Sequence, residues 1–355
     1  MLIKHAIIYQ MKSSIFCVCL FFFISLTSAQ TLVVLGTTQD AGKPQIGCQK
    51  SCCKNLKSRF FVASLGVSDI KNKKNYLFDA TPDITPQFQL LSGLTGLKSI
   101  DGIFLTHAHS GHYTGLMYLG KEGMNGNKIP VYAMPRFTNY LTNNGPWSQL
   151  VTLENINLMP LQSLVPITLD NGLVVMPIVV PHRDEYSETV GFKIIGTKKS
   201  ALYIPDIDKW KLWEKDIIAE VQAVDYAFID GLHTFEQVTK DVINTLNATK
   251  AGSWIGIHDL IPLNWIEEHV PGYPEHHWTG DVWKVIYFIK GLKGIEFNIV
   301  LIDHGVGLIK KTSDTIFFPN FPYHLQKLTY NDFIKDYNNL PIISWDDAVK
   351  WIKNK

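Results

Sequence analysis

Apolar runs in the first two thirds of the chain end abruptly at single polar residues. Runs of this length, bounded by turn residues, predict buried strands. The predicted strands cover residues 31–36, 75–79, 100–106 and 173–181, followed by a hairpin-like pair over 190–206. Asp79, His182 and Asp206 stand where such runs stop. Because loops at strand ends are held by a rigid sheet, these positions are candidates for function.

The pattern changes from about Val224. Apolar residues at helical spacing predict a helix over 234–249 with Thr234 as its N-cap, between strands at 224–230 and 252–259. A second helix at 280–292 and a hairpin at 296–311, turning at His304-Gly305, complete the rhythm of a doubly wound α/β sheet. Two short helices are expected after residue 330, the second opened by Ser344.

Composition limits the classes of function. Apolar residues make up 46% of the 355 residues and charged residues 18%, which is typical of a globular protein with a substantial core. The net charge of +1 gives no electrostatic reason to expect nucleic acid as a partner. We therefore expect a small-molecule substrate, and the sequence leaves the oligomeric state open.

The first 29 residues have the features of a secretory signal. A lysine at Lys12 precedes an apolar stretch from Ile15 to Leu26, and small residues end at Ala29. The apolar stretch is short for a membrane span, which needs roughly 20 residues. We expect cleavage after Ala29, no stable span afterwards, and a secreted or periplasmic protein; an uncleaved anchor is the alternative.

Three cysteines remain after the signal, in the segment "GCQKSCCKN". An odd number cannot form a closed set of disulfides within one chain. Two alternatives stay open: a structural zinc site, or a disulfide from Cys48 to Cys52 or Cys53 in an oxidising compartment.

Histidines gather after the strand at 100–106. Only His107, His109, His112 and His182 occur between Gln30 and Asp225. On an extended segment His107 and His109 point the same way, and His112 returns to the same point after a turn. Neutral imidazole is a common zinc ligand, and catalytic zinc uses about three protein ligands plus water. The pattern predicts a metal site, against the alternative of polar loop residues without a metal.

The segment "THAHSGH" resembles the H-x-H-x-D-H signature of the metallo-β-lactamase superfamily, followed in the same order by strands ending in His182 and Asp206. Within it, "VLGTTQDAGKPQIGC", "VPHRDEYSETVGFKI" and "YIPDIDKW" resemble the PqqB family of pyrroloquinoline quinone biosynthesis and its hydrolase relatives. The likeness covers about residues 31–228. It implies an α/β fold, an αββα sandwich that is complete or truncated.

The resemblance implies roles for the clustered residues. The first metal would be held by His107, His109 and His182, with Asp206 bridging and His112 serving a second metal. Gly111 stands where the family has an acid that binds the second metal, so we expect one ion, zinc, and a weakened second site. Asp79 is a candidate partner for a ligand imidazole or an ordinary turn acid.

The implied mechanism is metal-assisted hydrolysis. The ion lowers the pKa of its bound water to about 7 and polarises a carbonyl or phosphoryl oxygen. Asp206 would position the metal-bound hydroxide and His112 would assist, on an ester, amide or phosphodiester substrate.

The C-terminal third resembles a different family. "AFIDGLHTFEQVTKDVINTLNATKAGSWIGIHDLIP" and "WTGDVWKVI" are similar to the C-terminal half of class I S-adenosylmethionine-dependent methyltransferases, over about 224–352. No glycine-rich turn after a first strand precedes this segment, so a cofactor site is not expected. Asp230, His233, His258 and Asp259 are either a further metal site or leftover polar caps, and His258 is a candidate for the family's last ligand.

We therefore predict a signal peptide at 1–29, a metallo-β-lactamase-like domain at 30–228 and a Rossmann-like half-domain at 229–355. The expected function is that of an exported metal-dependent hydrolase. The alternatives are a methyltransferase-related protein, a non-catalytic degenerate metal-binding chimera and a PqqB-like role in cofactor biosynthesis.

Overall fold

A computed structural model describes residues 30–49, 53, 59–169, 172–208, 212–213, 225–229, 233–273, 278–302 and 304–353. The predicted signal peptide, most of the segment that follows Cys48 and the stretch after Asp208 lie outside these residues. In the described part of the chain, no helix is both long and apolar enough to cross a membrane.

The first sheet has six strands in chain order. Its strands are β1 (Gln30–Gly36), β2 (Ser64–Asp69), β3 (Lys74–Phe78), β4 (Gly102–Phe104), β5 (Ile129–Ala133) and β6 (Ile156–Pro160). β1 to β3 pair antiparallel and β3 to β6 parallel. Helices α3 (Ile84–Thr95), α5 (Pro135–Asn143) and α6 (Trp147–Thr152) supply Leu91, Phe137 and Leu150 to a core shared with this sheet.

The second sheet has nine strands among the described residues, in the order β15-β13-β14-β12-β11-β10-β9-β8-β7. Their bounds are β7 (Ile167–Thr168), β8 (Val174–Val179), β9 (Val190–Ile195), β10 (Ser200–Tyr203), β11 (Tyr226–Ile229), β12 (Trp254–Ile257), β13 (Ile295–Val300), β14 (Val306–Lys311) and β15 (Ile342–Ile343). β10 joins β11 through one register pair, Ala201 and Tyr226. Asp225 supports this junction, because its carboxylate accepts from the Ser200 backbone N at 2.9 Å.

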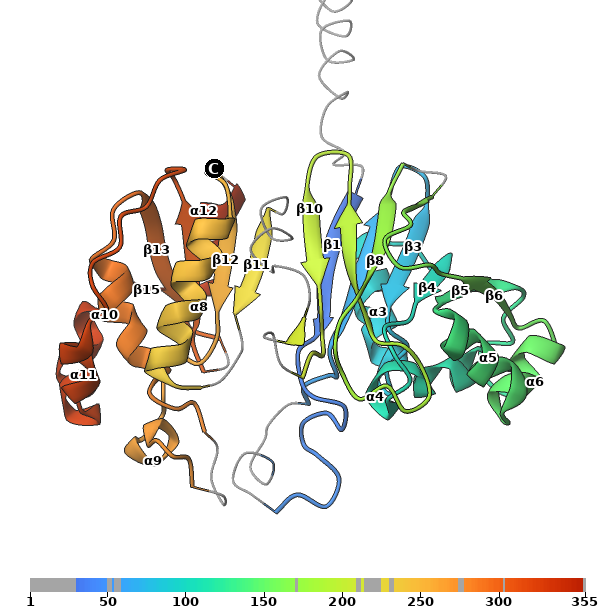
Figure 1. Cartoon of the computed structure of the whole chain (residues 1–355), viewed down its shortest axis with the longest axis horizontal. Helices are drawn as coiled ribbons and strands as arrows, with labels where there is room; N and C mark the ends of the chain where they lie inside the picture. The colour runs from blue at the N-terminus through green and yellow to red at the C-terminus, as the bar shows by residue number, and fades with distance from the viewer. Residues whose placement is uncertain are drawn as a thin grey trace, which may run out of the picture.

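The remaining described helices are short except one. They are α4 (Ser110–Tyr113), η1 (Thr114–Leu119), α8 (Phe235–Ala248), α9 (Trp265–Glu268), η3 (Val282–Lys284), α10 (Val285–Lys290), η4 (Tyr323–Lys327), α11 (Tyr330–Asp336), η5 (Tyr337–Asn339) and α12 (Trp345–Lys353). In Figure 1 the strands of the first sheet lie with α3, α5 and α6 on the right, and α8 lies over β12 on the left.

Aromatic side chains join the two sheets. The Phe104 ring of β4 stacks between Phe78 and Tyr132, with centroids 5.1 and 4.2 Å away. Phe192 from β9 meets the Phe104 ring edge-on at 5.7 Å. Offset and edge-on pairs of this kind add about 0.5–1.5 kcal/mol each beyond the burial of their area. This core fixes the sheets face to face, so the predicted sandwich of two sheets with helices outside is confirmed.

The local predictions for the C-terminal third are confirmed at several elements. Thr234 caps α8, because its hydroxyl accepts from the Gln237 backbone N at 3.4 Å. β13 and β14 form the predicted hairpin, and Gly305 has φ of 80° at its turn. Ser344 opens α12 by accepting from the Asp347 backbone N. The domain boundaries and the Rossmann-like assignment of this third remain predictions.

Replacing Phe104 by alanine should lower the free energy of unfolding by about 3–5 kcal/mol, because the ring is fully buried between both sheets. Leu94→Ala is the control, since Leu94 is 63% exposed on α3 and should change stability by no more than about 0.5 kcal/mol. Urea denaturation followed by tryptophan fluorescence measures both. Equal midpoints for the two variants would contradict the role given to this core.

Candidate metal centre

The three clustered histidines follow β4 and share one turn. The backbone O of Thr106 accepts from the Val190 N at 3.1 Å, which ties this loop to β9. His109 has extended backbone and is the N-cap of α4, and its carbonyl accepts from the His112 N at 2.9 Å. The short helix thereby turns His112 back toward His107, as the sequence predicted. The two rings lie 4.2 Å apart between centroids.

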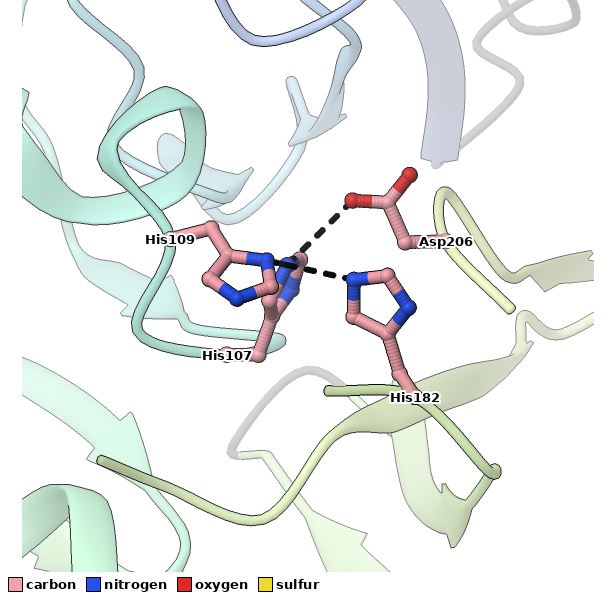
Figure 2. A group of neighbouring side chains, drawn as sticks. All are labelled: His107, His109, His182 and Asp206. Carbon is pink, nitrogen blue, oxygen red and sulfur yellow. Dashed lines mark hydrogen bonds and ion pairs between the residues drawn. The ribbon is translucent and has the colours of Figure 1, made fainter. Parts of the chain in front are cut away.

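Four side chains from the loops after β4, β8 and β10 point at one spot (Figure 2). His107 Nε2 and His182 Nε2 lie 2.9 and 3.1 Å from His109 Nδ1, and Asp206 Oδ2 lies 3.2 Å from His107 Nε2. Ligands of a tetrahedral zinc with bonds near 2.0–2.1 Å are about 3.3 Å apart. The spacing therefore suits a metal ion of this kind.

A second group shares Asp206 with the first. His112 Nε2 lies 3.1 Å from Asp206 Oδ2 and 3.2 Å from Asp40 Oδ1. These three donors lie within 4.8 Å of one another, as do the four of the first group. The structure thus brings together the five predicted ligands and adds Asp40; their roles as ligands or catalytic groups remain predictions.

The outward-facing ring nitrogens all meet oxygen atoms. His182 Nδ1 is 2.8 Å from Asp208 Oδ1, and His109 Nε2 is 2.9 Å from Glu185 Oε2. His112 Nδ1 is 2.8 Å from Asp79 Oδ2, and His107 Nδ1 is 3.0 Å from the Thr106 hydroxyl. When the outward nitrogen donates its proton, the inward nitrogen keeps a lone pair. The rings of His107, His109 and His182 are therefore arranged to offer lone pairs to the centre.

Asp79 organises this outer layer. It is 1% exposed and has φ of 69°, a left-handed conformation that turns the chain sharply after β3. Its carboxylate accepts from the Thr106 backbone N, the Thr106 hydroxyl and the Tyr203 hydroxyl, at 2.8–3.2 Å, and pairs with His112. Of the two interpretations, partner of a ligand imidazole or ordinary turn acid, these contacts favour the first.

The charges of the centre depend on one another. Burial lowers the pKa of His107, which keeps its imidazole neutral and able to bind a metal. Burial acts to lower the pKa of His112 too, but the negative charge of Asp79 and hydrogen bonds with Asp206 and Asp40 raise it well above its ordinary value. Burial acts to raise the pKa of Asp206, yet His107 and His112 lower it overall. A positive charge between these groups is therefore strongly favoured.

Sequence reasoning missed four side chains of the centre. Asp40, Glu185 and Asp208 all contact ligand imidazoles, and Tyr203 donates to Asp79. Asp208 stands two residues after Asp206, so its position in the same loop could have predicted that it lies near the centre. Asp40 carries no local signal, because it comes from a loop about 70 residues before His112.

The C-terminal candidates lie elsewhere among the described residues. His233 Nδ1 and His258 Nδ1 approach the Asp259 carboxylate at 3.2 and 3.4 Å. Neither histidine belongs to a group of potential metal ligands found among the described residues, and the role of His258 as a last ligand stays a prediction. Asp230 lies outside the described residues.

The cysteine segment is described in part. Cys48 carries a free thiol, so the predicted Cys48–Cys53 disulfide is wrong. Instead, Cys53 Sγ accepts a hydrogen bond from the Gln45 backbone N at 3.4 Å. Cys52 lies outside the described residues, and neither Cys48 nor Cys53 belongs to a group of potential metal ligands found among those that are described.

Replacing Asp79 by asparagine should weaken metal binding about 10–100-fold, because the amide is a poorer acceptor for His112 and Thr106. Asp69→Asn is a matched control, since Asp69 is also 1% exposed but lies at the other end of the β2–β3 pair. Competition with a chromophoric zinc chelator measures the affinity. An unchanged affinity in Asp79→Asn would contradict the positioning role of Asp79.

The chain resembles several solved structures and one family model. No curated protein matches the chain. Similar solved structures include zinc-bound PqqB from Methylobacterium extorquens (21% identity, 60% of this chain and 76% of that chain, TM-score 0.47). A diphosphatase from the PhnP family shows 24% identity over 57% of this chain and 74% of that chain, with a TM-score of 0.42.

A family model described as "Beta-lactamase superfamily domain" matches residues 74–258. The matched range is more than half of the 355 residues and contains His107, His109, His112, His182 and Asp206. The chain belongs to the β-lactamase superfamily domain family.

Proposed function

We propose that the chain is an exported, metal-dependent hydrolase that holds zinc at His107, His109 and His182, with Asp206 beside the ion. One observation carries this proposal: each imidazole of the centre contacts an oxygen with its outward nitrogen and directs the other nitrogen inward. Inward nitrogens at 2.9–3.1 Å repel one another unless a proton or a metal lies between them. The family of the chain supports the hydrolase class.

The donor set fits a catalytic zinc. Three imidazole nitrogens match the about three protein ligands of a catalytic zinc, which leave one position open for water. A zinc ion bound there supplies a water of lowered pKa and polarises a carbonyl or phosphoryl oxygen. Asp206 faces both His107 and His112, so its carboxylate is placed to orient a water and to accept its proton. When protonated, His112 Nε2 would donate a hydrogen bond to that carboxylate.

A cavity of about 470 Å³ gives access for a substrate. It is lined by Arg136, Tyr140, Glu185 and Tyr186 with neighbouring residues of α5. Glu185 also accepts from His109 Nε2 at 2.9 Å, so the cavity borders the metal centre. An ester, amide or phosphodiester group bound there would lie beside the proposed ion. Export is proposed from the signal-like residues 1–29.

His107→Ala should remove bound zinc and abolish hydrolysis of a panel of simple carboxylic and phosphate esters, because His107 Nε2 contacts two other donors of the group. His258→Ala is the matched control, since this histidine also stands just after a strand, β12 of the second sheet, but lies outside both ligand groups. Mass spectrometry gives metal per chain and absorbance gives the rate.

Stripping with a chelator and adding zinc back should remove and restore activity in the unmutated chain. A His107→Ala chain that keeps full zinc and full activity would contradict the proposal. Retained zinc with no hydrolysis in the unmutated chain would instead favour a non-catalytic metal binder.

A further inference from the structure

Asp40 occupies the space that a side chain at position 111 would need. A Cβ placed on Gly111 would lie 2.5 Å from the Asp40 Cα and 2.8 Å from its Cβ and Cγ. Real Cβ atoms do not approach other heavy atoms this closely, so an acid at 111 and the loop of Asp40 exclude each other. The glycine at 111 and the aspartate at 40 therefore depend on one another.

The loop that carries Asp40 is held in place by its own hydrogen bonds. It follows β1, and the backbone N atoms of Thr37 and Thr38 both donate to the Phe61 carbonyl at 3.0 Å. The Gln39 side chain accepts from the Ala41 N at 2.9 Å and donates to the Gly42 carbonyl at 3.1 Å. Asp40 is thus presented at the tip of a turn with a defined shape.

The carboxylate of Asp40 faces the second group of donors. Its Oδ1 lies 3.2 Å from His112 Nε2, and Asp206 Oδ2 lies 3.1 Å from the same nitrogen. His112 is 2% exposed, and its Nδ1 is already paired with Asp79 at 2.8 Å. With that nitrogen donating, Nε2 faces two carboxylates, an arrangement that needs either a proton on Nε2 or a metal cation among the three groups.

We propose that Asp40 replaces the acid missing at position 111 and completes a second divalent-cation site with His112 and Asp206. Asp206 belongs to both groups and would bridge the two ions. The inference rests on the proposed function, since it assumes the first ion at the same centre. It departs from the expectation of a single ion, which rested on the missing acid at position 111. Two carboxylates and one imidazole suit a divalent transition metal such as zinc or manganese.

Metal per chain separates the two sites. The full chain, loaded with zinc and dialysed, should hold about two ions, and Asp40→Ala should hold about one by inductively coupled plasma mass spectrometry. Asp40→Asn keeps the shape of the side chain and should also hold about one, which covers the case where the alanine variant folds poorly. Asp69→Asn is the matched control and should keep about two ions, because Asp69 lies outside both groups of potential ligands.

Manganese-loaded protein provides a second readout that does not depend on activity. Two ions sharing Asp206 should give an exchange-coupled paramagnetic resonance spectrum, and Asp40→Asn should give the six-line spectrum of an isolated ion. One ion in both the unmutated chain and Asp40→Asn, or two in both, would overturn this inference and leave the proposed function standing. No bound ion in the unmutated chain would overturn both.

Discussion

The arrangement of the centre depends on the buried carboxylate of Asp79. A buried carboxylate needs donors on its oxygens, and here Thr106, His112 and Tyr203 provide them. These donors come from the loop after β4 and from β10, so one charged group ties the first sheet to the second. Through Thr106 and His112 the same carboxylate also sets which ring nitrogens face the centre. The orientations of the His107 and His112 rings are in this way linked to how the sheets meet.

The packing between the two sheets also positions the ligands. His107 follows β4, whose Phe104 ring packs between Phe78 and Tyr132. This packing holds the end of β4 in place, and with it the start of the loop that carries His107. His182 and Asp206 come from loops of the other sheet. Neither sheet alone holds a complete set of donors, and the aromatic layer between the sheets keeps the two halves within bonding distance of one ion.

The sequence predicted the ligands of the first group because each stands at the end of an apolar strand or in the loop just after it. This pattern can be recognised without the structure. It could not predict Asp40, whose meaning depends on a contact with Gly111 across the fold. Gly111 alone indicated a weakened site, while the glycine and the aspartate together indicate a relocated ligand. In the C-terminal third, Thr234 and Ser344 predicted two helix starts correctly, because capping depends on residues close in sequence. The pairing of β11 with β10 through one pair of facing residues had no such local pattern to predict it.

The most direct test of the account is the position of the ring protons in the zinc-loaded chain. Long-range proton–nitrogen NMR of ¹⁵N-histidine-labelled protein distinguishes the nitrogen that carries hydrogen from the one that binds the metal. The account predicts hydrogen on Nδ1 of His107 and His182 and on Nε2 of His109. Hydrogen on Nδ1 of His109, or spectra that zinc leaves unchanged, would contradict it.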